Sequence, residues 1–107
     1  MSGVDLTPPA TVAAAAKKGL ALREKFARGG TEVGVKRAEG LAARHPIPAE
    51  DVGHIHSYFA RHAVDKDAKA HTWADESDPS AGYIAWLLWG GDAGQKWVGG
   101  LKAKLDG

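Results

Sequence analysis

Hydrophobic residues recur every three or four positions along most of this chain, which is the spacing of one face of an α-helix. No segment alternates apolar and polar residues over six positions, as a half-buried β-strand would. The pattern predicts five helices, over residues 8–28, 32–44, 48–64, 80–89 and 92–104. The expected fold class is therefore all-α: one compact five-helix domain over residues 1–107, with frayed ends at 1–6 and 105–107.

Residues that favour helix ends flank several of these segments. Thr7 is placed to cap the start of the first helix, and Thr31 is placed to cap the second. The glycines at 29–30 are expected to end the first helix, because glycine readily adopts the left-handed conformation found there. Asp92 followed by Gln95 has the spacing of a capping box and predicts the start of the last helix.

The segment 80–89 is apolar on almost every side, which is typical of a helix buried in the middle of a domain. We therefore expect a central apolar fourth helix in the core. The polar segment before it, residues 65–79, is long for a loop in a compact domain and predicts a functional or mobile loop. Trp73 within that loop is expected to anchor it on the core.

The third helix is expected to have one apolar face and one polar face. Its apolar positions are Val52, Ile55, His56, Phe59 and Ala63. His54, Tyr58 and Arg61 are spaced to lie on the opposite, outer side of the helix. We expect His56 to be a core histidine whose polar atoms are satisfied.

The composition is that of an ordinary globular domain. Hydrophobic residues make up 44% and charged residues 25% of the sequence. Cysteine is absent, which excludes disulfide scaffolds and thiolate metal sites. The apolar run at 83–89 is too short to span a bilayer, and the N-terminal residues lack the pattern of a signal peptide. We expect a soluble, cytoplasmic monomer without membrane contact.

Charge is unevenly distributed, although the formal net charge is only +1. Residues 17–45 contain eight Lys or Arg and three Glu, whereas residues 46–92 contain three Lys or Arg and eight Asp or Glu. A chain polarised in this way can present a basic face to a polyanion such as nucleic acid while staying near neutral overall. The competing interpretation is a basic face that is merely solvated.

No motif in the sequence points to catalysis. His54 and His56 are two residues apart, so they point to different sides of a helix, which does not suit metal chelation. Acidic residues crowd positions 75–78, but their spacing does not match an EF-hand calcium loop. We expect no catalytic residue, no metal and no cofactor. The competing hypothesis is an enzyme or metal protein that uses His54, His62 and the acidic loop.

The turn at residues 29–31 is the favoured phosphate contact, because it leads into a helix with free backbone N–H groups and has no acid at the cap. The similar glycine turn before the last helix carries Asp92, so we interpret it as a tight capped corner. In the second helix, Arg37, Gly40 and Arg44 share an outer stripe. The gap at Gly40 suits either the close approach of a nucleic-acid backbone or the packing of another helix.

These observations predict one continuous phosphate-binding surface on the first two helices and the turn between them. The candidate DNA-binding residues are Lys17, Lys18, Arg28, Gly30, Thr31, Lys36, Arg37 and Arg44. Binding by such a surface is electrostatic, so it depends strongly on salt and little on base sequence.

Three stretches of the sequence resemble a known family: GGTEVGVKRAEGL, SYFARHAVDK and PSAGYIAWLLWGGDAGQKW. They are similar to a small domain that recurs in tailed-phage and prophage proteins, beside head-maturation protease and other phage-associated domains. They are also similar to the small N-terminal DNA-binding module of some marine-phage ATP-dependent DNA ligases. The resemblance covers about residues 7–100.

The resemblance implies a DNA-binding module covalently linked to a catalytic domain, in a phage-infected or lysogenic bacterial host. Its implied role is that of an accessory domain of a phage DNA-processing enzyme such as a DNA ligase. The alternative that stays open is a protein–protein interaction module of phage head assembly and maturation, which would expose an apolar patch.

Overall fold

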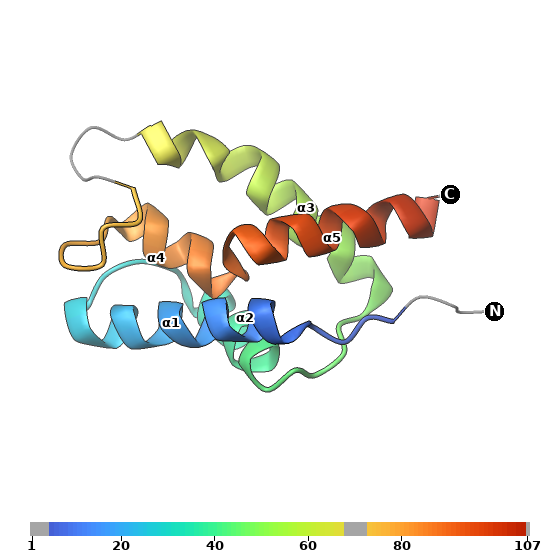
Figure 1. Cartoon of the computed structure of the whole chain (residues 1–107), viewed down its shortest axis with the longest axis horizontal. Coiled ribbons are helices and arrows are strands. Elements are labelled where there is room, and N and C mark those ends of the chain that lie inside the picture. The colour runs from blue at the N-terminus through green and yellow to red at the C-terminus, as the bar shows by residue number, and fades with distance from the viewer. Residues whose placement is uncertain (1–4, 68–72, 107) are drawn as a thin grey trace.

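In the computed structural model, the described part of the chain comprises residues 5–67 and 73–106 (Figure 1). It contains five α-helices and one short 3₁₀-helix. In chain order they are α1 (Ala10–Phe26), α2 (Glu32–Ala42), α3 (Ala49–His62), η1 (Ala63–Asp67), α4 (Ala81–Leu88) and α5 (Gly91–Asp106). These described residues contain no β-strand, and none of their helices is long and apolar enough to cross a membrane. The predicted all-α, five-helix fold is confirmed.

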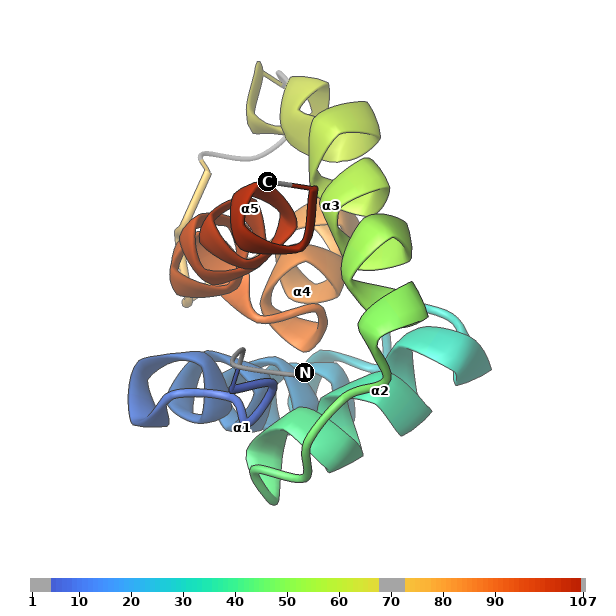
Figure 2. The same cartoon turned by 90° about the vertical axis from the view of Figure 1, so that its right-hand side faces the viewer.

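Helix α4 occupies the middle of the structure, because almost every side of it is apolar. Figure 2 shows α4 enclosed by the other four α-helices, and it packs against each of them. Trp86 is 1% exposed, and its ring meets the ring of Phe59 edge-on with 4.7 Å between the centroids. The central fourth helix predicted from the apolar sequence is confirmed.

Helices α1 and α4 approach each other closely at Gly19. A Cβ atom at this position would lie 2.8 Å from the backbone nitrogen of Leu88 and 2.9 Å from the Cβ of Leu87. Only a residue without a side chain fits at this separation. Gly19 therefore lets α1 pack directly on the backbone of α4.

The second helix starts as predicted, and the first does not. The hydroxyl oxygen of Thr31 accepts a hydrogen bond from a backbone N–H of the first turn of α2 at 3.2 Å. Helix α1 begins only at Ala10, after Pro9, and no side chain caps it. The predicted Thr7 cap is wrong because a residue that precedes a proline avoids helical backbone, and Thr7 and Pro8 each precede one.

The start of α5 also differs from the prediction. The glycines at 90–91 have φ angles of 117° and 65°, which let the chain turn sharply after α4. The helix therefore begins at Gly91, and Asp92 lies inside its first turn. The Asp92 carboxylate accepts hydrogen bonds from Trp86 Nε1 (2.9 Å) and Lys66 Nζ (3.0 Å). The predicted capping box is wrong, because this carboxylate is used to hold a core tryptophan.

Helices α1, α2 and α3 each end two residues earlier than predicted. Helix α1 ends at Phe26, where Ala27 already has a left-handed φ of 51°. Helix α2 ends at Ala42, so Arg44 lies beyond it, with a φ of 57°. Helix α3 ends at His62 and continues as η1.

The buried face of α3 is broader than the sequence predicts. Tyr58 is 6% exposed, although its spacing places it opposite the apolar residues of the helix. Helix α3 packs against both α4 and α5, so two of its sides are covered and not one. His56 is only half-buried, so its predicted place in the core is wrong.

Trp73 anchors the segment before α4, as predicted. Its ring meets the rings of Tyr83 and Trp86 edge-on, with centroid distances of 5.2 and 5.7 Å. The predicted loop over 65–79 begins as the 3₁₀-helix η1, and its residues 68–72 lie outside the described part of the chain.

Candidate nucleic-acid interface

Two neighbouring surface pockets meet at Gly30, in the turn between α1 and α2. The first, which we call the arginine pocket, has a volume of about 370 Å³. It is lined by Arg23, Ala27, Arg28, Gly29 and Gly30. The second, which we call the aromatic pocket, has a volume of about 400 Å³. It is lined by Gly30 and Thr31 from the turn, by Tyr58, Arg61 and His62 from α3, and by Ala81, Gly82, Ala85 and Trp89 from α4 and its end.

The turn that joins the two pockets depends on glycine. Gly29 and Gly30 have φ angles of 89° and 77°, which L side chains rarely adopt. A Cβ atom at Gly30 would also collide with the side chain of Leu88 in α4. The glycines therefore let the turn lie directly against α4, and Thr31 follows as the cap of α2.

The lining of both pockets carries positive charge. Arg23, Arg28 and Arg61 contribute guanidinium groups, and none of the lining residues is Asp or Glu. Arg23 Nε donates to a backbone carbonyl of the turn at 3.0 Å. Arg28 Nη1 donates to the carboxylate of Asp78 at 3.3 Å and to the carbonyl oxygen of Pro79 at 3.1 Å. Arg61 is exposed and forms no ion pair with another described residue.

Four planar groups are stacked beside the aromatic pocket, in the order Arg37, Trp89, Tyr58 and His62. The guanidinium carbon of Arg37 lies 4.9 Å from the centroid of the Trp89 ring. The rings of Trp89 and Tyr58 are within 5° of parallel, and their centroids are 4.2 Å apart. The His62 ring lies 4.5 Å from the Tyr58 ring at an angle of 30°. The stack joins α2, α3 and the end of α4.

Arg37 faces inward, so its predicted place on an outer stripe of α2 is wrong. Its side chain is 17% exposed, and its Nη1 donates to the carboxylate of Asp51 on α3 at 3.3 Å. Its Nε is buried and forms no hydrogen bond with the described residues. The inward position follows from packing, because the guanidinium covers the face of Trp89.

Arg44 also departs from the predicted stripe, whereas Gly40 lies open on α2. Arg44 follows the end of α2, and its Nε donates to the carbonyl oxygen of Pro8 at 2.8 Å. A Cβ atom at Gly40 would have no neighbouring atom within 4 Å. No helix of the described chain therefore packs at Gly40, and the predicted approach of a nucleic-acid backbone there stays a prediction.

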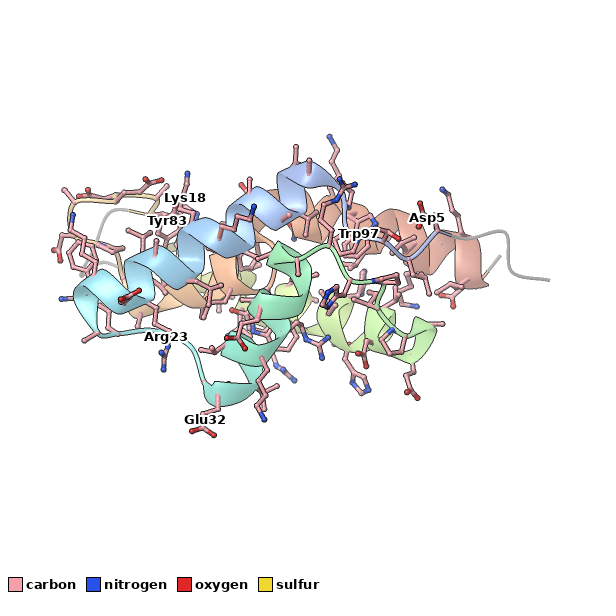
Figure 3. The ribbon with its side chains drawn as sticks, turned by 90° about the horizontal axis from the view of Figure 1, so that it is seen from below. Asp5, Lys18, Arg23, Glu32, Tyr83 and Trp97 are labelled. Carbon is pink, nitrogen blue, oxygen red and sulfur yellow. The ribbon has the colours of Figure 1, made fainter. Side chains whose placement is uncertain are left out.

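Lys18 forms an ion pair on another side of α1. Figure 3 shows Lys18 and Arg23 on opposite sides of the helix, with Lys18 beside Tyr83. Lys18 Nζ donates to the carboxylate of Glu76 at 2.9 Å, and the Tyr83 hydroxyl donates to the same carboxylate at 3.2 Å. The bond from Lys18 lowers the pKa of Glu76. Burial, and then the nearby charge of Glu76, raise the pKa of Tyr83 to about 12.

The structure brings together only part of the predicted DNA-binding set. Arg28 and Gly30 line the arginine pocket, and Gly30 and Thr31 line the aromatic pocket. Lys17 and Lys36 are exposed and form no ion pair with the described residues. The other predicted cations, Lys18, Arg37 and Arg44, line neither pocket and bond to Glu76, Asp51 and the carbonyl of Pro8.

Sequence reasoning did not include Arg23, Arg61 and His62 among the DNA-binding residues. Arg61 and His62 lie in the segment 46–92, which is acidic overall. A sum of charges over that segment therefore does not single them out. The helical spacing of α3 does place Arg61 on the outer side. Its position near Gly30 depends on how α2 and α3 pack around α4, which no local pattern encodes.

No three His, Asp or Glu side chains of the described chain are grouped as a metal site requires. His54 is exposed, and His62 packs against Tyr58. The described residues of the acidic loop contact Lys18 and Arg28 through Glu76 and Asp78.

Comparison of the chain with protein-family models, with curated protein sequences and with solved structures finds no match in any of the three.

Proposed function

We propose that this chain is a non-catalytic DNA-binding domain that holds phosphate groups at the arginine pocket and the aromatic pocket. One observation carries the proposal: three arginines line the two adjoining pockets, and none of the described residues that line them is Asp or Glu. Guanidinium groups form paired hydrogen bonds with phosphate oxygens, which makes arginine well suited to this ligand. Arg61 is the strongest candidate, because it forms no ion pair with another described residue.

Binding of this kind is largely independent of base sequence. Phosphate contacts position a protein on nucleic acid, whereas contacts to base edges read the sequence. Lys17 and Lys36 are exposed and add to the positive field of the first two helices. Each neutralised phosphate releases counterions, so the affinity falls as the salt concentration rises.

The domain is proposed to act as an appendage of a DNA-processing enzyme, such as a phage DNA ligase, in the bacterial cytoplasm. The resemblance of residues 7–100 to such modules supports this context. A DNA-binding domain on a tether raises the effective concentration of the linked catalytic domain at its substrate. This role requires no catalytic group in the domain itself.

Fluorescence anisotropy with two DNA duplexes of unrelated sequence, at several salt concentrations, tests the proposal. The parent protein should bind both duplexes alike, and the affinity should fall with salt. The Arg61→Ala variant should lower the magnitude of the salt slope by about 0.9 for one lost phosphate contact. Lys104→Ala is the matched control, because Lys104 lies in the last turn of α5 and lines neither pocket. Absence of binding at low salt, or equal slopes for the two variants, would contradict the proposal.

The alternative, a protein–protein module of phage head assembly, requires an exposed apolar patch. The exposed large apolar side chains among the described residues are Val33, Val64 and Leu105. They come from three different elements, α2, η1 and α5. They therefore support this alternative less than the two pockets support DNA binding.

A further inference from the structure

We propose that the aromatic pocket takes one unpaired base of a single-stranded nucleic-acid segment, whose phosphates lie against the arginine pocket. This inference rests on the proposed DNA-binding function, and it adds that the site binds single-stranded nucleic acid. The volume of the aromatic pocket, about 400 Å³, is in the range of pockets that hold small ligands.

Small residues on one side of α4 give the aromatic pocket its depth. Ala81 and Ala85 line the pocket one helical turn apart, whereas Tyr83 and Trp86 of the same helix are buried in the core. The short side chains leave space at the surface of a helix that is otherwise covered. A larger side chain at position 85 would fill that space without changing any charge.

Planar groups from α3 and the end of α4 line the pocket together with the turn. The two faces of Trp89 are covered by Arg37 and Tyr58, so Trp89 offers its ring edge to a ligand. Arg61 and His62 supply two further planar groups that line the pocket. Bases stack on aromatic rings and on guanidinium planes with little dependence on sequence. A base inside a duplex has both faces covered by its neighbours, so this wall favours an unpaired base.

The charges around the pocket favour a ligand that carries phosphate groups over an uncharged ligand. The two pockets share Gly30, so the backbone attached to a base in the aromatic pocket would pass this glycine toward Arg23 and Arg28. No Asp or Glu is among the described residues that line this path, and the nearby Asp78 carboxylate is paired with Arg28. An apolar peptide would gain nothing from these arginines, whereas a phosphate can accept from the terminal nitrogens of Arg23 and from Arg61, and at Arg28 it competes with Asp78.

Filling the pocket tests the proposal without altering its charge. The probes are a fluorescein-labelled oligothymidylate of about 12 nucleotides and a blunt duplex of the same length. Ala85→Leu should weaken binding of the oligothymidylate by about tenfold, because one lost stacking contact is worth this much or more. The same variant should leave duplex binding within about twofold, since the arginines are intact. Ala103→Leu, at an exposed position of α5, is the matched control and should change neither affinity.

The possible outcomes separate this inference from the function on which it rests. If the parent protein binds neither probe, the proposed DNA-binding function is wrong. If the parent binds both probes and Ala85→Leu weakens both equally or neither, DNA binding stands and the base pocket is wrong.

Photo-crosslinking of the parent protein provides a measurement that does not depend on folding of the variant. Oligothymidylate carrying 5-iodouracil should crosslink to the peptide that contains Tyr58 and His62, or to the peptide that contains Trp89. Crosslinks confined to the outer face of α1, around Lys17, would overturn the base pocket. Digestion and mass spectrometry identify the crosslinked peptide.

Discussion

The indole ring of Trp89 lies parallel to the phenol ring of Tyr58, and this contact ties the end of α4 to the middle of α3. Arg37 covers the other face of the indole and pairs with Asp51, so α2 is held by the same stack. Three helices that meet at the aromatic pocket are thus fixed relative to one another by planar contacts. The wall of the pocket is formed before any ligand arrives, which reduces the ordering that binding requires.

The Tyr58–Trp89 pair should show a coupling energy of about 0.5–1.5 kcal/mol in a double-mutant cycle. Tyr58→Leu and Trp89→Leu keep an apolar side chain and remove the stacked rings. Urea unfolding of the parent, the two single variants and the double variant measures the coupling. A value of zero would mean that the rings stabilise the fold only through the surface that they bury.

Trp86→Ala should lower the free energy of unfolding by about 3–5 kcal/mol, because it empties the space of a large core side chain. Trp86→Phe should cost less, since it keeps a ring and removes the N–H group that donates to Asp92. Thermal unfolding of both variants measures the difference. Trp97→Ala on α5, where the side chain is half-buried, is the control and should be milder. Parent-like melting of Trp86→Ala would contradict the central position of α4.

Two glycine-to-alanine changes should have opposite effects on stability. Gly19→Ala places a Cβ 2.8 Å from the backbone nitrogen of Leu88, so overpacking should cost about 1–3 kcal/mol. Gly40→Ala meets no atom within 4 Å, so the better helix propensity of alanine should add about 0.5–1 kcal/mol. Chemical denaturation of the two variants against the parent decides the signs. A stabilising effect of Gly19→Ala would contradict the close packing of α1 on α4.

Stability should fall as the pH rises from 10 toward 12, because the fold raises the pKa of Tyr83 from 10 to about 12. In this window the unfolded chain has lost the phenol proton and the folded chain retains it, so high pH favours unfolding. The slope contributed by this group approaches about 1.4 kcal/mol for each pH unit. Tyr83→Phe has no proton to lose, so its stability should decline less steeply over this range. The same slope in both proteins would contradict the burial of the Tyr83 hydroxyl beside Glu76.

The double variant Arg37→Ala with Arg44→Ala should affect stability more than DNA binding. Each change removes a hydrogen bond made by a charged group, to Asp51 or to the carbonyl of Pro8, worth about 1.5–3 kcal/mol. The salt slope for duplex binding should stay close to that of the parent. Lys17→Ala with Lys36→Ala is the matched pair of exposed cations and should show the reverse, a lower slope with little loss of stability. A lower salt slope for the Arg37→Ala, Arg44→Ala variant would mean that these arginines do contact DNA.

Local patterns in the sequence were sufficient to predict the five helices and the segment at the centre of the core. Segment 80–89 is apolar on almost every side, and only a central position buries all of it. The cap at Thr31 depends on its own helix turn, so a short motif predicts it correctly. The cap expected at Thr7 failed for an equally local reason, the two prolines that follow it.

The candidate site was harder to predict, because its residues come together through packing between distant segments. Tyr58 is buried only because the end of α4 brings Trp89 over it. Arg37 is drawn inward by the same tryptophan, and spacing within α2 gives no sign of this. The part of the site that the sequence did indicate, at Arg28, Gly30 and Thr31, belongs to the single short segment between α1 and α2.

The close contact of α1 with α4 at Gly19 bears on how the chain folds as it is synthesised. The inner residues of α1, such as Val12 and Leu22, belong to a core whose centre is supplied by residues 81–88. A growing chain that has released only its first three helices can pack α1 against α2, but it lacks the buried residues of α4 on which both helices also pack. The core can close only when α4 has left the ribosome, near the end of translation of these residues. Folding of this domain therefore waits until α4 is available, and chaperones have their opportunity to bind the chain before then.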